Sequence, residues 1–283
     1  MIQVSNLKYT YPGAKLPTLK GLDFEIAKGE IFGFLGPSGA GKSTCQKILY
    51  KIIGQFEGQI DINGKNIQQW GREYFENIGV GFELPNHYGK LTAKENLELF
   101  AAFYSKDKCS DILPLLEMVG LENEANKQVD SFSKGMKMRL NFVRAIMHNP
   151  NILFFDEPTS GLDPVNAQIL KNHMRDLRNQ GKTIFITTHD MATADELCDR
   201  VAFIVDGEIC ITEKPSTLKL EHGKNAVKVE LKGGAVSEFP LGALGTNPAF
   251  LSFIAQDEVL RIHTQEATLE QVFIDVTGKK LSV

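Results

Sequence analysis

The nine residues GPSGAGKST, at positions 36–44, constrain the fold more than any other part of the sequence. They follow the apolar segment IFGFL and match the pattern G-x-x-x-x-G-K-[ST]. In such a loop several backbone N–H groups point at one phosphate, and Gly36, Gly39 and Gly41 permit the tight turn that this requires. The helix that starts here directs its positive end at the anion. A glycine-rich turn that only caps a helix is the alternative, but the spacing and the preceding strand favour a phosphate-binding loop.

The side chains of this loop supply the groups that a nucleotide needs. Lys42 places a positive charge near the β- and γ-phosphates, and the hydroxyl of Ser43 is a ligand for Mg²⁺. We therefore predict a nucleotide-binding segment made of Gly36, Pro37, Ser38, Gly39, Ala40, Gly41, Lys42, Ser43 and Thr44.

Two adjacent carboxylates end the apolar segment ILFFDE, at residues 152–157. Asp156 is placed to hold Mg²⁺ through water, and Glu157 is placed to polarise an attacking water molecule. Surface charges at a strand end are the alternative, and the phosphate loop upstream favours the catalytic interpretation. These motifs together predict a nucleoside triphosphatase in which Lys42 and Glu157 are catalytic residues.

Strand and helix patterns alternate along the chain. The first 35 residues are β-rich, and residues 58–67 contain an Asn-Gly pair that is typical of a hairpin. Apolar strands are expected at 152–157, 183–189 and 201–209, and a helix at 165–181. This alternation predicts an α/β fold with a parallel sheet that is covered on both faces.

Two capping boxes predict where helices begin. Thr92 with Glu95 precedes an apolar helical pattern that continues to Tyr104, and Thr268 with Gln271 precedes a second helix near the end of the chain. The pattern changes near residues 215–225, where short strands appear. We therefore predict a domain at 1–220, with a helical subdomain at about 90–150, and a small α+β accessory domain at 221–283.

Composition limits the class of partner. The net charge of −4 and the pI near 5.9 do not indicate the basic face that nucleic acids require, so no nucleic acid partner is expected. There is no apolar run of membrane-spanning length and no signal peptide core, so a cytosolic chain is expected. The cysteines, Cys45, Cys109, Cys198 and Cys210, lack metal-binding spacing and are expected to be reduced thiols, many of them buried.

Five motifs in a fixed order carry a resemblance to a known family. They are the phosphate loop, the turn SFSKGM at 131–136, the DE pair, GLDP at 161–164 and the histidine of TTHD, His189. Over roughly residues 1–215 the chain resembles the ATPase subunit of ATP-binding cassette (ABC) proteins. The resemblance implies a P-loop ABC-type nucleotide-binding domain with a RecA-like core, an antiparallel β subdomain and a helical subdomain. It also implies ATP and Mg²⁺ as cofactors, and ATP hydrolysis that is coupled to transport.

The turn SFSKGM at 131–136 matches what is called the signature turn in the resembled family. In that family two subunits pack head to tail, and the signature turn of one closes over the γ-phosphate that the other holds. The resemblance implies that Ser133 offers a hydroxyl and Gly135 a backbone N–H to the opposite nucleotide, with Asp163 near the facing phosphate loop. It implies further that His189 is catalytic and bonds the γ-phosphate. Without that context, a histidine that simply completes a strand end is the favoured interpretation.

The resemblance also assigns an aromatic residue to adenine. Tyr11 matches the position of the aromatic residue that stacks on adenine in the family, and Tyr9 is the alternative residue for this role.

The signature and one metal position depart from the family pattern. Lys134 and Met136 replace the first glycine and the glutamine of the usual LSGGQ, and Lys134 adds positive charge beside the γ-phosphate. Glu83 stands where the family has a glutamine that binds Mg²⁺ and senses the transporter. We hypothesise that Glu83 keeps metal binding but changes the coupling of hydrolysis to movement.

The resemblance implies partners as well. Residues 84–97, LPNHYGKLTAKENL, lie where the family contacts a short cytoplasmic helix of the membrane subunit. A separate multi-span membrane permease is therefore expected, together with a homodimer or a heterodimer with another ATPase subunit. The chain would then lie peripherally on the inner face of the cell membrane.

Particular segments resemble bacterial drug and antibiotic exporters. These are the tail at 268–281, the signature that carries a lysine, and residues 79–92, which resemble the ATPase subunits of fluoroquinolone exporters. A non-transport ABC ATPase, of the DNA-repair or chromosome type or of the iron–sulfur assembly type, is the alternative.

Overall fold

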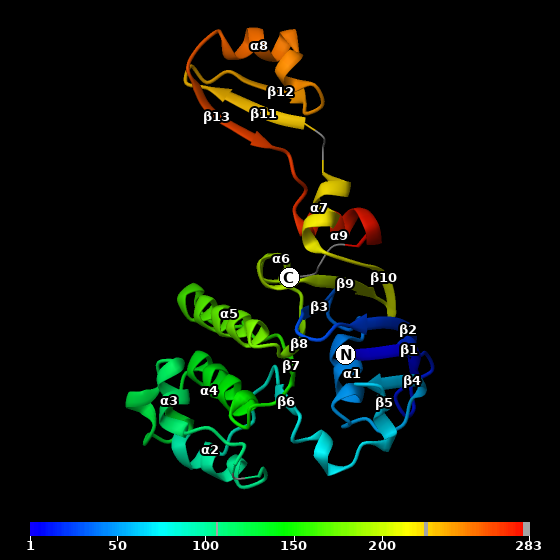
Figure 1. Cartoon of the computed structure of the whole chain (residues 1–283), viewed down its shortest axis with the longest axis vertical. Helices are drawn as coiled ribbons and strands as arrows, with labels where there is room; N and C mark the ends of the chain where they lie inside the picture. Colours follow the sequence, from blue (N-terminus) through cyan, green and yellow to red (C-terminus); the bar gives the residue numbers. More distant parts are fainter. Residues whose placement is uncertain (106, 224–225, 280–283) are drawn as a thin grey trace. The chain divides into compact units, whose positions relative to one another are not determined.

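The computed structural model of the chain describes residues 1–105, 107–223 and 226–279 (Figure 1). The chain divides into two compact units, Met1–Lys214 and a second unit that begins at Pro215. Helix α7 (Pro215–His222) belongs to the second unit and spans the predicted boundary between residues 220 and 221. Positions 224, 225 and 280–283 of the predicted accessory segment lie outside the described residues.

A six-stranded sheet with the order β10-β9-β3-β8-β7-β6 organises the first unit. Its strands are β3 (Ile31–Leu35), β6 (Ile78–Gly81), β7 (Ile152–Asp156), β8 (Thr183–Thr188), β9 (Arg200–Val205) and β10 (Glu208–Glu213). The strands from β9 to β6 pair in parallel, and β10 pairs antiparallel with β9. Every residue of β3, β7 and β8 is buried, as in a parallel sheet covered on both faces. The predicted parallel sheet is confirmed.

The single strand that we predicted at residues 201–209 is wrong, because the chain reverses within it. Asp206 and Gly207 have φ angles of 49° and 82°, and they join β9 to β10 as a hairpin. An Asp-Gly pair with positive φ at both positions is a favoured two-residue hairpin turn. The apolar residues before the pair and the alternating residues after it therefore belong to two strands.

A second, antiparallel sheet has the order β2-β1-β4-β5. Its strands are β1 (Ile2–Tyr9), β2 (Leu19–Ile26), β4 (Glu57–Ile62) and β5 (Lys65–Asn66). Asn63 and Gly64, with φ angles of 52° and 79°, form the turn between β4 and β5, so the predicted hairpin is confirmed.

Helices lie between the strands of the first unit along the sequence, and more than one of them separates β6 from β7. They are α1 (Lys42–Leu49), α2 (Ala93–Ala101), α3 (Ile112–Met118), α4 (Lys134–Ile146), α5 (Pro164–Asn179) and α6 (Met191–Leu197). Single 3₁₀ turns are formed by Ile67–Gln69, Arg72–Tyr74, Glu122–Glu124 and Val129–Ser131.

The first capping box is confirmed, but its helix is shorter than we predicted. The hydroxyl of Thr92 accepts from the backbone N–H of Glu95, and the Glu95 carboxylate accepts from that of Thr92. Helix α2 ends at Ala101 rather than at Tyr104. The N–H groups of Phe103 and Tyr104 bond to carbonyls three residues back, so the last residues tighten into a 3₁₀-like turn.

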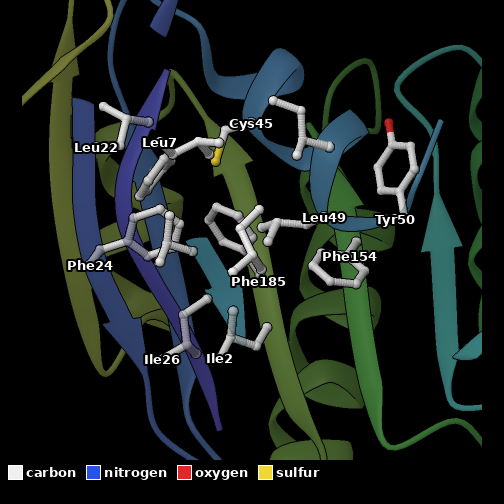
Figure 2. Close-up of a cluster of buried hydrophobic side chains, with 14 of the residues drawn as sticks. Ile2, Leu7, Leu22, Phe24, Ile26, Cys45, Leu49, Tyr50, Phe154 and Phe185 are labelled. Atoms are coloured by element: carbon white, nitrogen blue, oxygen red, sulfur yellow. The ribbon is translucent and has the colours of Figure 1, made fainter. Parts of the chain in front are cut away.

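Helix α1 is anchored in an apolar core that includes residues of both sheets (Figure 2). Cys45 and Leu49 of α1 are fully buried there, with Phe24 of β2 and with Phe154 and Phe185 of the large sheet. Full burial of an aromatic or aliphatic side chain stabilises the fold by about 1.5–3 kcal/mol. Because α1 follows the phosphate loop directly, this core also fixes the position of the loop.

The second unit is a small α+β structure. Its sheet has the order β12-β11-β13, with β11 (Ala226–Leu231), β12 (Val236–Pro240) and β13 (Val259–Thr264). Besides α7 it contains the 3₁₀ turn Leu244–Thr246, α8 (Pro248–Ile254) and α9 (Leu269–Thr277), and the capping box of Thr268 and Gln271 is confirmed. Within the described ranges, no helix of either unit is both long and apolar enough to cross a bilayer.

Candidate functional site

The phosphate loop connects β3 to α1 under tight steric constraint. A Cβ atom at Gly36 would lie 2.1 Å from the carbonyl oxygen of Ile204 on β9. At Gly41 φ is 105°, and a Cβ atom would lie 2.7 Å from Cδ2 of Leu19. Gly39 has open space around it but a φ of 81°. Glycine is therefore required at 36 by packing, at 39 by backbone conformation, and at 41 by both.

The ammonium group of Lys42 lies against the loop itself. Its side chain is buried, and Nζ donates to the carbonyl oxygens of Gly36 at 2.6 Å and Pro37 at 3.1 Å. Burial lowers the pKa of Lys42, while nearby carboxylates, Glu157 foremost, act in the opposite direction. Neutral carbonyl groups satisfy a buried cation less well than an anion does, so this arrangement suits a phosphate.

Asp156, at the end of β7, is fixed by two hydroxyl groups. Ser43 Oγ donates to Asp156 Oδ1 at 3.1 Å, and the hydroxyl of Thr187 donates to the same oxygen. Asp156 and Thr187 are neighbours in the parallel register of β7 and β8, and both are buried. A hydroxyl and a carboxylate oxygen side by side are the ligand types that Mg²⁺ takes, so these residues fit that ion.

Glu157 has a left-handed backbone and two side-chain partners. Its φ is 50°, which turns the chain sharply after β7. Thr188 Oγ1 donates to Oε2 at 3.0 Å, and Nδ1 of His189 lies 2.8 Å from Oε1. Because a carboxylate oxygen only accepts, the imidazole donates through Nδ1, which leaves Nε2 of His189 for another partner. The side chain of Glu157 is 10% exposed, whereas that of His189 is 53% exposed.

Tyr11 lies at the edge of the same site. Its hydroxyl is 3.1 Å from Oγ1 of Thr44, and its ring meets that of Tyr9 edge-on at a centroid distance of 4.9 Å. These contacts hold Tyr11 next to the start of α1, and its side chain stays partly open to solvent.

A pocket of about 430 Å³ brings most of the predicted site residues together. It is lined by Tyr11, Thr18, Ser38, Gly39, Gly41, Lys42, Ser43, Thr44, Glu83, Glu157 and His189. Asp156 contacts this set through Ser43. The predicted residues Ser133, Gly135 and Asp163 are not among the lining residues.

These three residues lie instead at the N-termini of two helices. Ser133 is the N-cap of α4, where its hydroxyl accepts from the backbone N–H of Met136 at 3.2 Å, and Gly135 follows in the first turn. Asp163 caps α5 in the same way, and hydrogen bonds from Asn166 lower its pKa. Ser133 and Asp163 are both exposed.

Lys134 connects these two helix starts. A Cβ atom at Gly161 would lie 2.7 Å from both Cε and Nζ of Lys134, so the lysine side chain passes directly over Gly161. The two motifs therefore meet within one chain.

Sequence reasoning did not single out Thr187 and Thr188, the hydroxyls that hold Asp156 and Glu157. Their signal is the pair of threonines at the end of β8. In a parallel sheet this strand end lies beside the end of β7, provided that β7 and β8 are known to be neighbours.

The fold and the site together define a P-loop nucleoside triphosphatase: a phosphate loop joins a parallel strand to a helix, and a carboxylate ends a nearby strand. The sequence profile described as ABC transporter matches residues 19–160. A fluoroquinolones export ATP-binding protein of Mycobacterium tuberculosis (strain CDC 1551 / Oshkosh) is 49% identical over 286 residues, covering 100% of this chain and 95% of the relative. The chain therefore belongs to the ABC transporter family.

Further similarities agree with this membership. A Nod factor export ATP-binding protein I of Rhizobium sp. (strain N33) is 34% identical, covering 98% of this chain and 90% of the relative. A dimeric ATP-binding cassette solved in a post-hydrolysis state with ADP and Pi is 28% identical, with a TM-score of 0.67 over 76% of this chain and 98% of that one. The predicted fold class is confirmed, and the chain is an ATP-binding, ATP-hydrolysing protein of this family.

Proposed function

We propose that this chain is the motor subunit of an ABC exporter that works as a head-to-tail dimer of cassettes and drives a separate membrane subunit. The names of the fluoroquinolone and Nod factor relatives support export. The dimeric state of the similar solved cassette supports pairing, with a second copy of this chain or with another ATPase subunit.

The observation that carries this proposal is the separation of two half-sites within one chain. Lys42, Glu157 and His189 line the pocket, whereas Ser133 and Gly135 at the start of α4 do not. Backbone N–H groups at a helix N-terminus favour an anion. A second copy placed head to tail would bring its exposed signature turn to the pocket, and each site would then be complete.

The phosphate side of the site has a role for each group. Residues 36–41 wrap the phosphates, Lys42 neutralises their charge, and Tyr11 stacks on adenine. Ser43, Asp156 and Glu83 would hold Mg²⁺. When it is bound, Mg²⁺ neutralises charge on the β- and γ-phosphates.

The catalytic proton transfer falls to Glu157. Thr188 and His189 hold one oxygen each of its carboxylate, which orients the group to accept a proton from the attacking water. Because Nδ1 of His189 is engaged by Glu157, Nε2 is the nitrogen that would reach the γ-phosphate.

An apolar groove supports docking to a membrane subunit. The groove has a volume of about 660 Å³, and its lining includes Tyr50, Phe82, Leu84, Phe100 and Tyr104. Leu84 is 71% exposed and lines this groove together with the aromatic side chains, so an apolar surface is open to a partner. A short amphipathic helix of the permease would cover these side chains and hold the chain at the inner face of the membrane.

A mixing experiment tests the head-to-tail arrangement. Lys42→Ala removes the phosphate charge of one copy, and Gly135→Asp places a negative charge at the signature turn of another. A Cβ atom at Gly135 meets its nearest atom at an acceptable 3.4 Å, and an acid in the first turn suits the helix dipole, so Gly135→Asp should fold. Each variant alone should be inactive. Mixed, they should regain ATPase activity, because a heterodimer combines one intact pocket with one intact signature turn.

Two controls define the outcome. Gly54→Asp places the same charge at an exposed glycine with no heavy atom within 4 Å, and this variant should be active alone. If the mixture of Lys42→Ala and Gly135→Asp stays inactive although the two copies associate, the proposal of a site shared between copies is wrong.

A further inference from the structure

The segment that carries Glu83 is held by helix α4. Residues 82–87 form neither helix nor strand. Nδ2 of Asn141 donates to the carbonyl oxygen of Phe82 at 2.8 Å, and Nη1 of Arg144 donates to that of Asn86 at 2.9 Å. These two bonds hold the backbone on either side of Glu83. Together with the contact between His87 and Lys137, we call them the α4 clasp.

His87 adds a third point to the clasp. Its Nε2 lies 3.1 Å from the carbonyl oxygen of Lys137 in α4. Burial lowers the pKa of His87 to about 4, so the ring is neutral near pH 7. A carbonyl oxygen only accepts, so the neutral ring carries its proton on Nε2.

Arg144 fixes which way the amide of Asn141 points. Nη2 of Arg144 donates to Oδ1 of Asn141 at 2.6 Å, and a guanidinium group has no acceptor. The NH₂ group of the amide must therefore face Phe82. Asn141 is 3% exposed and Arg144 is 8% exposed, with the guanidinium 4.8 Å from the ring centroid of Phe100. Both side chains are thus held by packing as well as by hydrogen bonds.

Asn141 therefore holds the backbone of Phe82, the residue next to Glu83, whose carboxylate belongs to the nucleotide pocket. Glu83 lines that pocket together with Lys42, and its charge acts on the pKa of Lys42. Glu83 is exposed, so the placement of its backbone sets the region that its carboxylate can reach.

We propose that Asn141 is a positioning residue for the ATPase site, because its amide fixes the backbone next to Glu83 and so places the Glu83 carboxylate for the metal ion. This inference rests on the metal role proposed above for Glu83. Asn141 is not among the residues that line the nucleotide pocket. It lies on α4, the helix that begins at the signature turn.

Asn141→Asp isolates the bond that matters. The variant keeps an acceptor for Arg144 and nearly the same volume, but it loses the donor to Phe82 and places an oxygen against the carbonyl. Asn141→Ala is a second variant, in case the buried carboxylate prevents folding. Asn172→Asp is the matched control, because Asn172 on α5 likewise accepts from an arginine three residues on, Arg175, but is exposed.

The test measures metal affinity directly and in two backgrounds. Mn²⁺ binding is titrated by electron paramagnetic resonance in the presence of a non-hydrolysable ATP analogue, with and without Glu83→Ala. The Mg²⁺ concentration for half-maximal ATPase activity is a second readout. We expect Asn141→Asp or Asn141→Ala to weaken Mn²⁺ binding by roughly fivefold, the loss of one hydrogen bond, but to have no further effect when Glu83 is already alanine. Metal-free nucleotide binding should be unchanged in both.

The outcomes separate this inference from the proposed function. Two results would show that the positioning role is wrong while the metal role of Glu83 stands. In the first, Glu83→Ala weakens Mn²⁺ binding but the Asn141 variants do not. In the second, the Asn141 variants weaken Mn²⁺ binding by the same factor whether residue 83 is glutamate or alanine. If Glu83→Ala itself leaves Mn²⁺ binding unchanged, the metal role of Glu83 and the positioning role are both overturned.

Discussion

The phosphate pocket and the signature turn differ in how buried their side chains are and in what those side chains bond to. The pocket face, defined here as Lys42, Ser43, Asp156, Glu157 and Thr187, consists mostly of buried groups that hydrogen-bond to one another, to the loop or, for Glu157, to Thr188 and His189. The signature face, defined as Ser133, Lys134, Gly135 and Asp163, lies at exposed helix starts whose side chains cap their own helices or cross a neighbouring turn. One face is held by its own hydrogen bonds, and the other presents groups to solvent.

This difference indicates how stability and activity should separate. A hydrogen bond to a buried charged group contributes about 1.5–3 kcal/mol, so substitutions on the pocket face should lower both the free energy of unfolding and the ATPase rate. An exposed charge contributes about 0–1 kcal/mol. Substituting Lys134 should therefore change the rate and leave the stability nearly unchanged, whereas replacing the N-cap Ser133 or Asp163 should also lower the free energy of unfolding by about 0.5–2 kcal/mol.

The largest expected effect is that of Glu157→Gln. The amide keeps the shape of the side chain but is no base, so the ATPase rate should fall by about 10²- to 10³-fold while ATP binding persists. With ATP retained, the dimer should accumulate and be detected by size-exclusion chromatography. Glu208→Gln, at a well-exposed carboxylate on β10, is the control and should keep its rate. A fully active Glu157→Gln protein would contradict the role of Glu157 as the base.

Gly36→Ala should have the next largest effect, this time on stability as well. The new Cβ atom would meet the backbone oxygen of Ile204 at 2.1 Å, so the strand or the loop must shift. Overpacking of this kind lowers the free energy of unfolding by about 1–3 kcal/mol, and nucleotide binding should weaken with it. Gly54→Ala, at a position with open space and no positive φ, should be neutral or slightly stabilising. Denaturant unfolding and nucleotide titration of both variants measure the contrast, and equal effects would contradict it.

Thr187→Val sharpens the comparison with a smaller change. The substitution removes a hydroxyl that donates to Asp156 and keeps the side-chain volume. We expect the free energy of unfolding to fall by about 2 kcal/mol and the Mg²⁺ requirement to rise. Chemical denaturation and a Mg²⁺ titration of the ATPase rate test both effects. A change in stability without any change in Mg²⁺ requirement would separate Thr187 from the metal site.

Lys134→Gln should have the smallest effect and only on the rate. The free energy of unfolding should change by less than about 0.5 kcal/mol, since the residue is exposed. If the charge of Lys134 acts on the opposite nucleotide, the rate should fall modestly at low ionic strength, and the difference should disappear at high salt because exposed charges are screened. A rate difference that persists at high salt would mean that the contact with Gly161, rather than the charge, is what matters.

Local sequence signals predicted much of the fold because their causes are local. The capping pairs of Thr92 and Thr268 and the hairpin turn at Asn63 depend on neighbours a few residues away, and all three are confirmed. The Asp-Gly turn at 206 is an equally local signal, but the apolar run before it favours a single continuous strand when it is considered alone.

The parts of the site that sequence patterns did not predict depend on which elements become neighbours. Thr187 holds Asp156 because β7 and β8 are adjacent strands, and the order of strands is not written in either segment. The bond from Asn141 to Phe82 joins residues 59 positions apart, and the crossing of Lys134 over Gly161 joins the start of α4 to the turn before α5. Motifs predict the chemistry of the pocket, but only the folded chain shows which side chains support it.

The passage of Lys134 over Gly161 constrains how these two positions can evolve. A side chain gained at 161 would meet the flexible end of the lysine and would also be strained by the φ angle of 73°, so a smaller residue at 134 would remove only the first obstacle. Among descendants of this chain, we therefore expect glycine to persist at 161 while the residue at 134 varies.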